Sequence, residues 1–275
     1  MWWSIIGLGG SCFVTSTDKK TALKGYQVWE DGKLRAMCGH ECEEVLAREA
    51  LVYKHLGEHP HILRCYGLEG VHPSGGINSL RLEYSPLGEV RSFIEKNRPR
   101  PPSKGIRLQM ALDVATGMSH VHKMGVQHCD MTCRNLFLFD NFRVKIGDFG
   151  GSLIQGHDEL KPIVYEASAY ELPRRGREFE KRPARERELF ALGSAIYEIM
   201  AWGQPFEGLA DDDIEKNYAA EVFPNLEGVT ANHIIRKCWD EQYTSADEIV
   251  ESLEALIVLE AEANVGGRTN TGTLV

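Results

Sequence analysis

The amino-acid sequence changes character near Gly88, and this change restricts the fold more than any other feature. Before it, short apolar segments such as 12–14 and 80–84 alternate with turns around one segment, 41–56, whose apolar residues recur at helical spacing. After it, helical patterns dominate, and 189–202 is almost continuously apolar, which is typical of a helix buried on all sides. A strand-rich part followed by a helical part predicts an α+β protein with two lobes.

Composition and charge narrow the class of protein. The 275 residues suit either one large domain or two lobes, and 43% hydrophobic with 26% charged residues is ordinary for a globular protein. The net charge of −9 repels phosphate backbones, so nucleic acid is not expected as a partner. Seven scattered cysteines form no dense even framework, which favours reduced thiols in the cytoplasm or nucleus. No run of apolar residues is long enough to predict a membrane span.

A glycine-rich segment lies near the N-terminus, at 7–14. Gly7 and Gly9 begin it, and glycines let backbone N–H groups approach phosphates closely. Glycine clusters alone are more often plain turns. A dinucleotide-binding loop is not supported, because no helix follows and Cys12 occupies the position of the third glycine.

Lys24 and Glu49 form the second candidate group. Lys24 ends a strand-like segment, whereas Glu49 lies on the apolar face of the expected helix 41–56. A carboxylate is costly there without a partner. A strand lysine can hold phosphates while a helix carboxylate holds the lysine. The alternative is a solvated lysine and a surface glutamate.

Two loops in the second half of the chain contain the remaining candidates. Asp130 and Asn135 lie five residues apart in 128–135, and Asp148 begins Asp-Phe-Gly after the strand-like segment 143–146. Asp130 is the candidate to align a substrate hydroxyl and accept its proton, whereas Asn135 and Asp148 are candidate Mg²⁺ ligands. A single Asp is more often a cap or turn residue, so the prediction depends on the order and spacing of all four groups.

Together these segments resemble the eukaryotic protein kinase family over nearly the whole chain. Cys238-Trp239 is similar to its tyrosine-kinase-like and tyrosine kinase groups. The resemblance implies a bilobal catalytic domain over 1–263, with a small lobe at 1–83, a hinge at 83–88 and a large lobe at 89–263. The segment 264–275 is expected to be a flexible tail. The resemblance also implies that ATP and Mg²⁺ bind between the lobes and that the γ-phosphate passes to a protein hydroxyl.

The resemblance assigns further residues to the nucleotide site. They are Val14, Ala22 and Phe137 against the adenine ring, backbone groups of Glu83 and Ser85 at its edge, and Glu89 at the ribose. It also implies that Tyr53, Cys65, His128 and Phe149 stack as a spine through the assembled site.

The sequence departs from the family pattern at several positions. Cys129 replaces an arginine that usually binds a phosphate on the activation segment, and a thiol cannot do this. The hypothesis that follows is that phosphorylation of this segment is not the main on-switch; the hydroxyls concerned are Ser152, Tyr165, Ser168 and Tyr170. Tyr170 also replaces the proline of the usual Ala-Pro-Glu.

The class of hydroxyl stays open. Thr132 stands where Ser/Thr kinases usually carry Lys, and Arg134 matches many tyrosine kinases. Because most kinases act on Ser or Thr, these are slightly favoured. The alternatives to a protein kinase are a pseudokinase that serves as an ATP-binding or scaffold module, and a small-molecule phosphotransferase.

A basic run over 174–187 lies in this otherwise acidic chain. The favoured interpretation is a solvated loop paired with Glu178, Glu180 and Glu186. The alternative is a surface that attracts acidic or already phosphorylated substrates.

Overall fold

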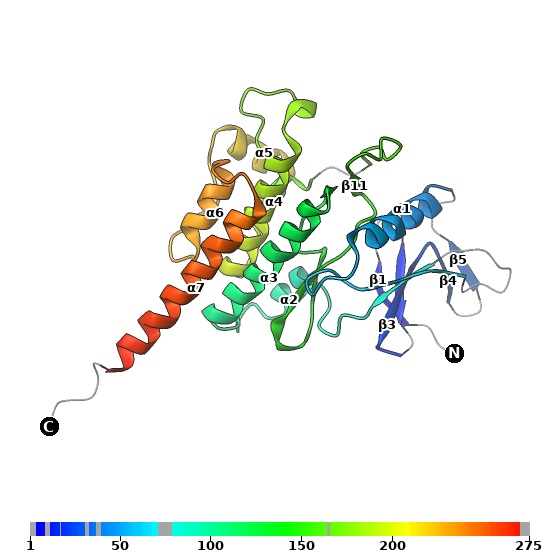
Figure 1. The fold of residues 1–275 in the computed structure, drawn as a ribbon, viewed down its shortest axis with the longest axis horizontal. Coiled ribbons are helices and arrows are strands. Elements are labelled where there is room, and N and C mark those ends of the chain that lie inside the picture. Colours follow the sequence, from blue (N-terminus) through cyan, green and yellow to red (C-terminus); the bar gives the residue numbers. More distant parts are fainter. Residues whose placement is uncertain are drawn as a thin grey trace.

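The α+β prediction is confirmed in a computed structural model that describes residues 4–8, 12–16, 18–30, 33–36, 40–70, 79–163 and 166–269. Figure 1 shows strands and one helix at one end and a helical body at the other. Five antiparallel strands form the small-lobe sheet in the order β1-β2-β3-β7-β6. They are β1 (Ser4–Leu8), β2 (Phe13–Ser16), β3 (Thr21–Gly25), β6 (Cys65–Glu69) and β7 (Ser79–Glu83).

The remaining elements of the small lobe are a ribbon and a helix. The ribbon pairs β4 (Gln27–Glu30) with β5 (Lys33–Ala36). The helix α1 (His40–Leu56) packs on β6 and β7. Strand β3 lies in the middle of the sheet and is buried from Ala22 onward, so a charge on it needs a partner inside the protein.

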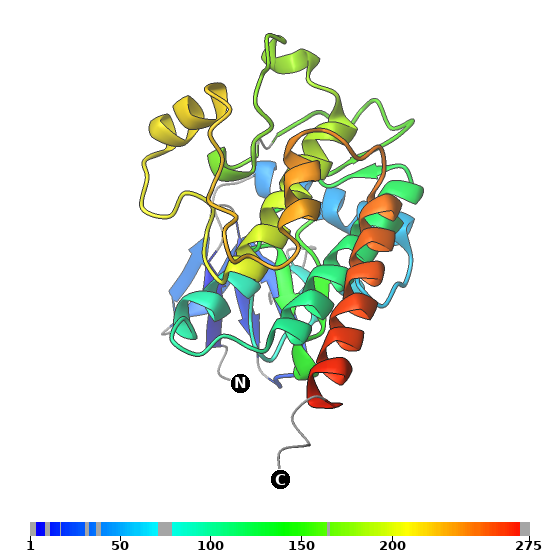
Figure 2. The same ribbon diagram turned by 90° about the vertical axis from the view of Figure 1, so that its left-hand side faces the viewer.

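The large lobe is a helical body. Its helices are α2 (Val90–Lys96), α3 (Lys104–Lys123), α4 (Ala184–Ala201), α5 (Asp211–Ala219), α6 (Asn232–Trp239) and α7 (Ala246–Thr269). Helix α4 packs against α3 and α6 and is buried over most of its length, as its apolar run predicts. Figure 2 shows α7 alongside α3, where the two helices are in contact.

Two short ribbons join the lobes and hold the polar loops. Strand β8 (Val126–Gln127) pairs with β11 (Leu153–Ile154), and β9 (Leu136–Leu138) pairs with β10 (Val144–Ile146). The loop 128–135 leaves β8 and enters β9, whereas the loop 147–152 leaves β10 and enters β11. Because the ribbons fix both ends of each loop, the two loops are held side by side. Three single-turn helices complete the lobe: η1 (Asp140–Phe142), η2 (Ser168–Tyr170) and η3 (Phe179–Lys181).

The C-terminal segment is more regular than predicted. Helix α7 continues to Thr269, into the segment 264–275 that was expected to be a tail. The preceding residues 253–263 are mostly Leu, Ala and Glu, which propagate a helix well. Residues 270–275 lie outside the described part of the chain. No described helix has the length and apolarity needed to cross a bilayer.

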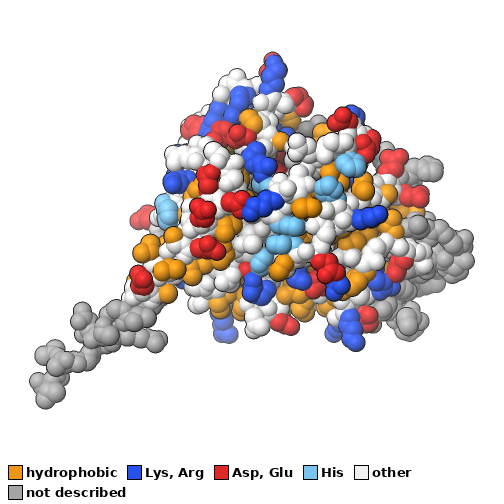
Figure 3. All heavy atoms as spheres, viewed as in Figure 1, with side chains coloured by type: hydrophobic (Ala, Val, Ile, Leu, Met, Phe, Trp, Pro, Cys, Tyr) orange, Lys and Arg blue, Asp and Glu red, His pale blue; other side chains and the backbone are white. Residues whose placement is uncertain are grey.

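A cluster of histidines joins the lobes on the face shown in Figure 3. The His59 ring stacks on His120 with centroids 4.3 Å apart and lies 5.7 Å from the His61 ring. Burial, followed by repulsion from His120 and His61, lowers the pKa of His59 to about 4. At neutral pH the folded protein therefore contains the uncharged ring.

This arrangement predicts acid sensitivity. The folded-state pKa of His59 lies below its ordinary value of 6.5. Its contribution to stability is therefore complete above about pH 6.5 and is lost as the pH falls toward 4. Between pH 7 and pH 5 we expect the melting temperature of the wild type to fall further than that of His59→Asn. Equal falls in both proteins would contradict the prediction.

Candidate active site

Lys24, Glu49 and Asp148 meet at the junction of the two lobes. Lys24 Nζ lies 2.7 Å from Glu49 Oε2 and 2.6 Å from Asp148 Oδ1. Glu49 is completely buried, and Lys24 is 9% exposed. The apolar-face position of Glu49 is thereby explained, because its carboxylate faces a buried ammonium. The predicted association of Lys24 with Glu49 is present, and Asp148 joins it.

The three charges shift one another's pKa values. Burial would lower the pKa of Lys24, but Asp148 and Glu49 together raise it well above its ordinary value. Burial also opposes the charge on Asp148, and the Lys24 ammonium outweighs it and lowers the pKa. Burial raises the pKa of Glu49, since the ammonium is shared with a second carboxylate. Lys24 is therefore charged at all physiological pH values, and Asp148 is ionised beside it.

The backbone after β10 directs Asp148 toward this group. Asp148 has a φ of 62°, in the left-handed region. Gly150 leaves room for α1, because a Cβ there would come within 2.9 Å of a Val45 methyl carbon. Between them, the Phe149 ring lies 5.0 Å from the rings of both Tyr53 and His128. These aromatic contacts of the expected spine are therefore present, and they link α1 to the catalytic loop.

Asp130 and Asn135 are held together on the loop 128–135. Asn135 Nδ2 donates to the Asp130 backbone oxygen at 2.7 Å and to Asp130 Oδ2 at 2.9 Å. The Asp130 amide donates to His128 Nδ1 at 3.3 Å. The Gly147 amide donates to the Asn135 carbonyl at 2.9 Å, which brings this loop against the one that carries Asp148. The structure thus brings all five candidate catalytic residues to one junction.

The support for this loop comes from Glu188, whose role the sequence did not reveal. Glu188 Oε1 accepts from the His128 amide at 2.6 Å and from the Cys129 amide at 3.0 Å. His122 Nε2 lies 2.9 Å from the other oxygen. Burial opposes the charge, but the His122 contact lowers the pKa of Glu188. A glutamate at the start of a nearly continuous apolar helix was the available clue, because a buried carboxylate needs donors.

The side-chain oxygen atoms of Asn135 and Asp148 are suitable ligands for Mg²⁺. The Asn135 side-chain nitrogen is occupied by Asp130, which leaves its oxygen for a cation. Asp148 adds a carboxylate, and both are the hard oxygen ligands that Mg²⁺ prefers. Among the described residues no group of three or more His, Cys, Asp or Glu would hold a metal alone.

The expected nucleotide residues lie around the same junction. Val14 and Ala22 are on β2 and β3, and Phe137 is on β9. The Ser85 amide has no acceptor among the described residues, whereas the Glu83 amide donates to the Arg64 carbonyl at 2.8 Å. The Ser85 amide therefore remains a candidate contact to adenine, whereas of the two Glu83 backbone groups only the carbonyl does. Gly7 lies on β1, and Gly9 lies outside the described residues.

Glu89 carries an unsatisfied polar atom at this junction. One carboxylate oxygen of Glu89 accepts from the Ser92 hydroxyl. The other is buried with no donor in the described part of the chain. Since buried polar atoms are normally paired, a donor from a ligand is expected here. A ribose hydroxyl would satisfy the oxygen, in agreement with the role expected for Glu89.

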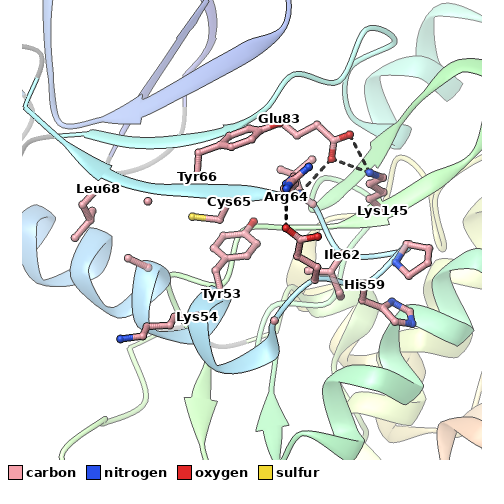
Figure 4. Close-up of a pocket in the computed structure, with 16 residues that line it drawn as sticks. Tyr53, Lys54, His59, Ile62, Arg64, Cys65, Tyr66, Leu68, Glu83 and Lys145 are labelled. Carbon is pink, nitrogen blue, oxygen red and sulfur yellow. Dashed lines mark hydrogen bonds and ion pairs between the residues drawn. The ribbon is translucent and has the colours of Figure 1, made fainter.

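A cavity of about 820 Å³ lies elsewhere, between the end of α1 and β6 (Figure 4). Its walls include Tyr53, Arg64, Glu83 and Lys145 and none of the five candidate catalytic residues. The Glu83 carboxylate is turned into it and lies 2.7 Å from Lys145 Nζ. This cavity is therefore not the nucleotide cleft.

Two hydroxyls of the activation segment, 148–171, are inaccessible. Ser152 Oγ donates to the His128 carbonyl at 3.0 Å, and Ser152 is completely buried. The Tyr170 hydroxyl lies 2.9 Å from Arg91 Nη2, contacts Glu198 and is also buried. Ser168 is half-buried, and Tyr165 lies outside the described residues. The segment cannot be phosphorylated at Ser152 or Tyr170 without being displaced.

The basic run is paired, although mostly with other partners than those expected. Arg175 bonds Glu221 and Glu241, and Arg177 also bonds Glu241. Other members bind carboxylates closer in sequence: Lys181 with Glu178, Arg182 with Glu171, and Arg187 with Glu166. Of the expected partners only Glu178 appears in these pairs, because turns after α5 and α6 supply Glu221 and Glu241, and the activation segment supplies Glu166 and Glu171.

The fold has two lobes, and the candidate residues Lys24, Glu49 and Asp148 meet between them. The family model of protein tyrosine and serine/threonine kinases matches residues 33–253. The chain therefore belongs to the protein tyrosine and serine/threonine kinase family.

Curated relatives are kinases of several kinds. The chain is 30% identical to serine/threonine/tyrosine-protein kinase HT1 of Arabidopsis thaliana over 58% of its length. It is 26% identical to serine/threonine-protein kinase LMTK3 of Mus musculus over 82%, and 24% identical to fibroblast growth factor receptor 1 of Dugesia japonica over 76%. The matches span 41%, 17% and 26% of those proteins, in that order.

Proposed function

We propose that this chain is an active protein kinase that transfers the γ-phosphate of Mg-ATP to serine or threonine hydroxyls of proteins. The observation that carries the proposal is the meeting of Lys24, Glu49 and Asp148 within 2.7 Å, beside the hydrogen-bonded Asp130 and Asn135. A protein that served only as a scaffold would have no physical need for all five. Burying these charges costs free energy that binding and catalysis would justify.

Each residue has a separate task in the proposed mechanism. Lys24, held by Glu49, offers a permanent positive charge to the phosphates. Asp148 and Asn135 hold Mg²⁺, which supplies neutralisation of the phosphate charge when bound. Asp130 orients the substrate hydroxyl and accepts its proton, while Asn135 keeps Asp130 in place through its amide. Orientation of this kind, with charge stabilisation, accounts for most catalysis of phosphoryl transfer.

The class of substrate is part of the proposal. Family membership implies protein substrates, and the relatives include Ser/Thr and dual-specificity kinases by name. Arg134 is exposed within the loop 128–135 and has no ion-pair partner among the described residues, so phosphorylation of tyrosine is the second candidate. The amino acid that becomes labelled in a transfer assay decides between them.

A preference for acidic or phosphorylated substrates would depend on few charges. Within the basic run, Arg174 and Arg185 are exposed and bind no described carboxylate. Arg174 lines a cavity of about 590 Å³ between 168–179 and α5. Arg174→Glu therefore tests the preference, whereas Arg175 and Arg177 have structural ion pairs. An unchanged ratio of kcat/KM for acidic and neutral peptides would contradict it.

The alternative function is a pseudokinase that binds ATP or a partner without transfer. Cys12 in the glycine-rich loop is the observation that favours it, since its side chain is buried where the family has none. In either case Cys65, Cys129, Cys133 and Cys238 are free thiols, which supports a reducing compartment, the cytoplasm or the nucleus.

The proposed function is tested by phosphate transfer from labelled Mg-ATP to a mixed protein substrate. We expect the wild type to label Ser and Thr. In Asp130→Asn the rate of phosphate transfer should fall roughly a hundredfold or more, because the residue that aligns the hydroxyl and accepts its proton is removed. The midpoint of thermal unfolding with ATP, with and without Mg²⁺, is recorded in parallel. An intact wild type that binds ATP and transfers nothing would establish the pseudokinase instead.

A further inference from the structure

We propose that the Glu166–Arg187 ion pair is a positioning device, which sets the substrate-binding end of the activation segment against the catalytic loop without phosphorylation. The inference rests on the proposed function, because the position matters for transfer to a protein substrate. Glu166 and Arg187 belong to the activation segment and to α4, respectively.

The pair has the geometry of a strong contact. Arg187 Nε lies 2.8 Å from Glu166 Oε1, and Arg187 Nη2 lies 2.7 Å from Glu166 Oε2. Two parallel bonds of this kind fix orientation as well as distance. The Glu166 side chain is 4% exposed and that of Arg187 23%, so solvent screens the pair little. Burial alone would lower the pKa of Arg187, but Glu166 raises it.

Helix α4 connects this pair to the catalytic loop. The residue after Arg187 is Glu188, whose carboxylate accepts from the His128 and Cys129 amides. Two consecutive side chains of one helix therefore hold the activation segment and the catalytic loop. A helix is rigid over one turn, so the position of Glu166 relative to Asp130 is fixed through α4.

The described residues around the pair disfavour a bound phosphate. Cys129 is the nearest residue of the catalytic loop, and burial, assisted by Glu188 and Glu166, raises its pKa to about 12. The thiol is therefore uncharged at neutral pH. A phosphate bound beside it would meet the carboxylates of Glu166 and Glu188, and like charges repel.

Further contacts hold both sides of Glu166. Toward the N-terminus, Arg48 Nη1 on α1 donates to the Lys161 carbonyl at 2.7 Å. Toward the C-terminus, Tyr170 is buried, and Arg182 Nη1 lies 3.0 Å from Glu171 Oε1. The segment is thus anchored to the helix α1, to the catalytic loop through α4, and to the chain that follows it. None of these contacts requires a modified residue.

The test compares Glu166→Gln, the charge-swapped double variant Glu166→Arg/Arg187→Glu, and the control Glu178→Gln. Glu178 pairs with Lys181 nearby, but its side chain is 73% exposed, so its loss should change nothing measurable. For Glu166→Gln we expect the KM for a protein substrate to rise about tenfold, since a charge-assisted contact is lost. The ATP-induced thermal shift should be unchanged, and the swapped pair should recover much of the loss.

Two readouts separate this proposal from its alternatives. Hydrogen exchange of amides 166–172 should increase in Glu166→Gln and return toward the wild-type rate in the swapped variant. Wild type treated with phosphatase should keep its activity. The proposal is overturned if Glu166→Gln lowers only the melting temperature and leaves KM and exchange unchanged, or if phosphatase abolishes transfer. Hydrogen exchange does not require activity. A wild type that transfers nothing would therefore refute the proposed function, while the exchange of amides 166–172 would still test the role of the Glu166–Arg187 pair.

Discussion

In Asp148→Asn the rate of phosphate transfer should fall roughly a thousandfold or more, and Mg²⁺ should no longer strengthen ATP binding. Asp148 is the residue that contacts Lys24 at 2.6 Å and also offers a carboxylate to the cation. An amide oxygen is a weaker Mg²⁺ ligand than a carboxylate, because it carries no net charge. Both the metal and the phosphate contacts therefore depend on this one side chain.

The measurement is the unfolding midpoint with ATP, with and without Mg²⁺, beside the transfer assay. Wild type at about 100 times Kd should gain about 2.7 kcal/mol from the nucleotide. Asp148→Asn should show no further gain on adding Mg²⁺, whereas Asp130→Asn should keep it and lose only transfer. A Mg²⁺-dependent gain of wild-type size in Asp148→Asn would show that the cation is held elsewhere.

The second large effect concerns stability. Arg91→Met should lower the free energy of unfolding by about 3–5 kcal/mol, because Glu198 would become a buried charge without a counter-ion, with only the Tyr170 hydroxyl still bonded to it. Both nitrogens of the Arg91 fork bond the Glu198 carboxylate at 2.9 Å, and Glu198 is completely buried. For a protein of this size the loss corresponds to a fall in melting temperature of roughly 6–20 °C. The Tyr170 hydroxyl shares this cluster, so the activation segment should loosen as well.

Two controls make the result interpretable. Arg98 forms an exposed pair with Glu207, and Arg98→Met should cost less than about 1 kcal/mol. The double variant Arg91→Met/Glu198→Leu removes both charges and should recover most of the stability, since hydrophobic replacement of a buried pair is often neutral. If Arg91→Met and the wild type have the same midpoint of denaturant unfolding, the cluster of Arg91, Tyr170 and Glu198 does not stabilise the large lobe.

Local patterns were sufficient for the frame of the protein and for most candidate site residues. Asp130 and Asn135 are five residues apart, and a short loop between two strands brings them into contact. Glu49 was identified because a carboxylate on an apolar helix face requires a partner, and Lys24 is that partner. The alternation of strands and helices before and after Gly88 likewise depends on neighbours in sequence.

Tertiary structure alone decided the partners of the other charges. Arg91 bonds Tyr170 and Glu198, which lie 79 and 107 residues away, and Arg175 of the basic run bonds Glu221 and Glu241, in turns that follow α5 and α6. In an extended chain each of these arginines has many possible carboxylates. Packing of α4 between α3 and α6 selects one, because burial makes an unpaired charge costly. The sequence by itself therefore determined the class of fold and supplied the candidate residues for phosphoryl transfer, whereas long-range burial determined how the activation segment is held.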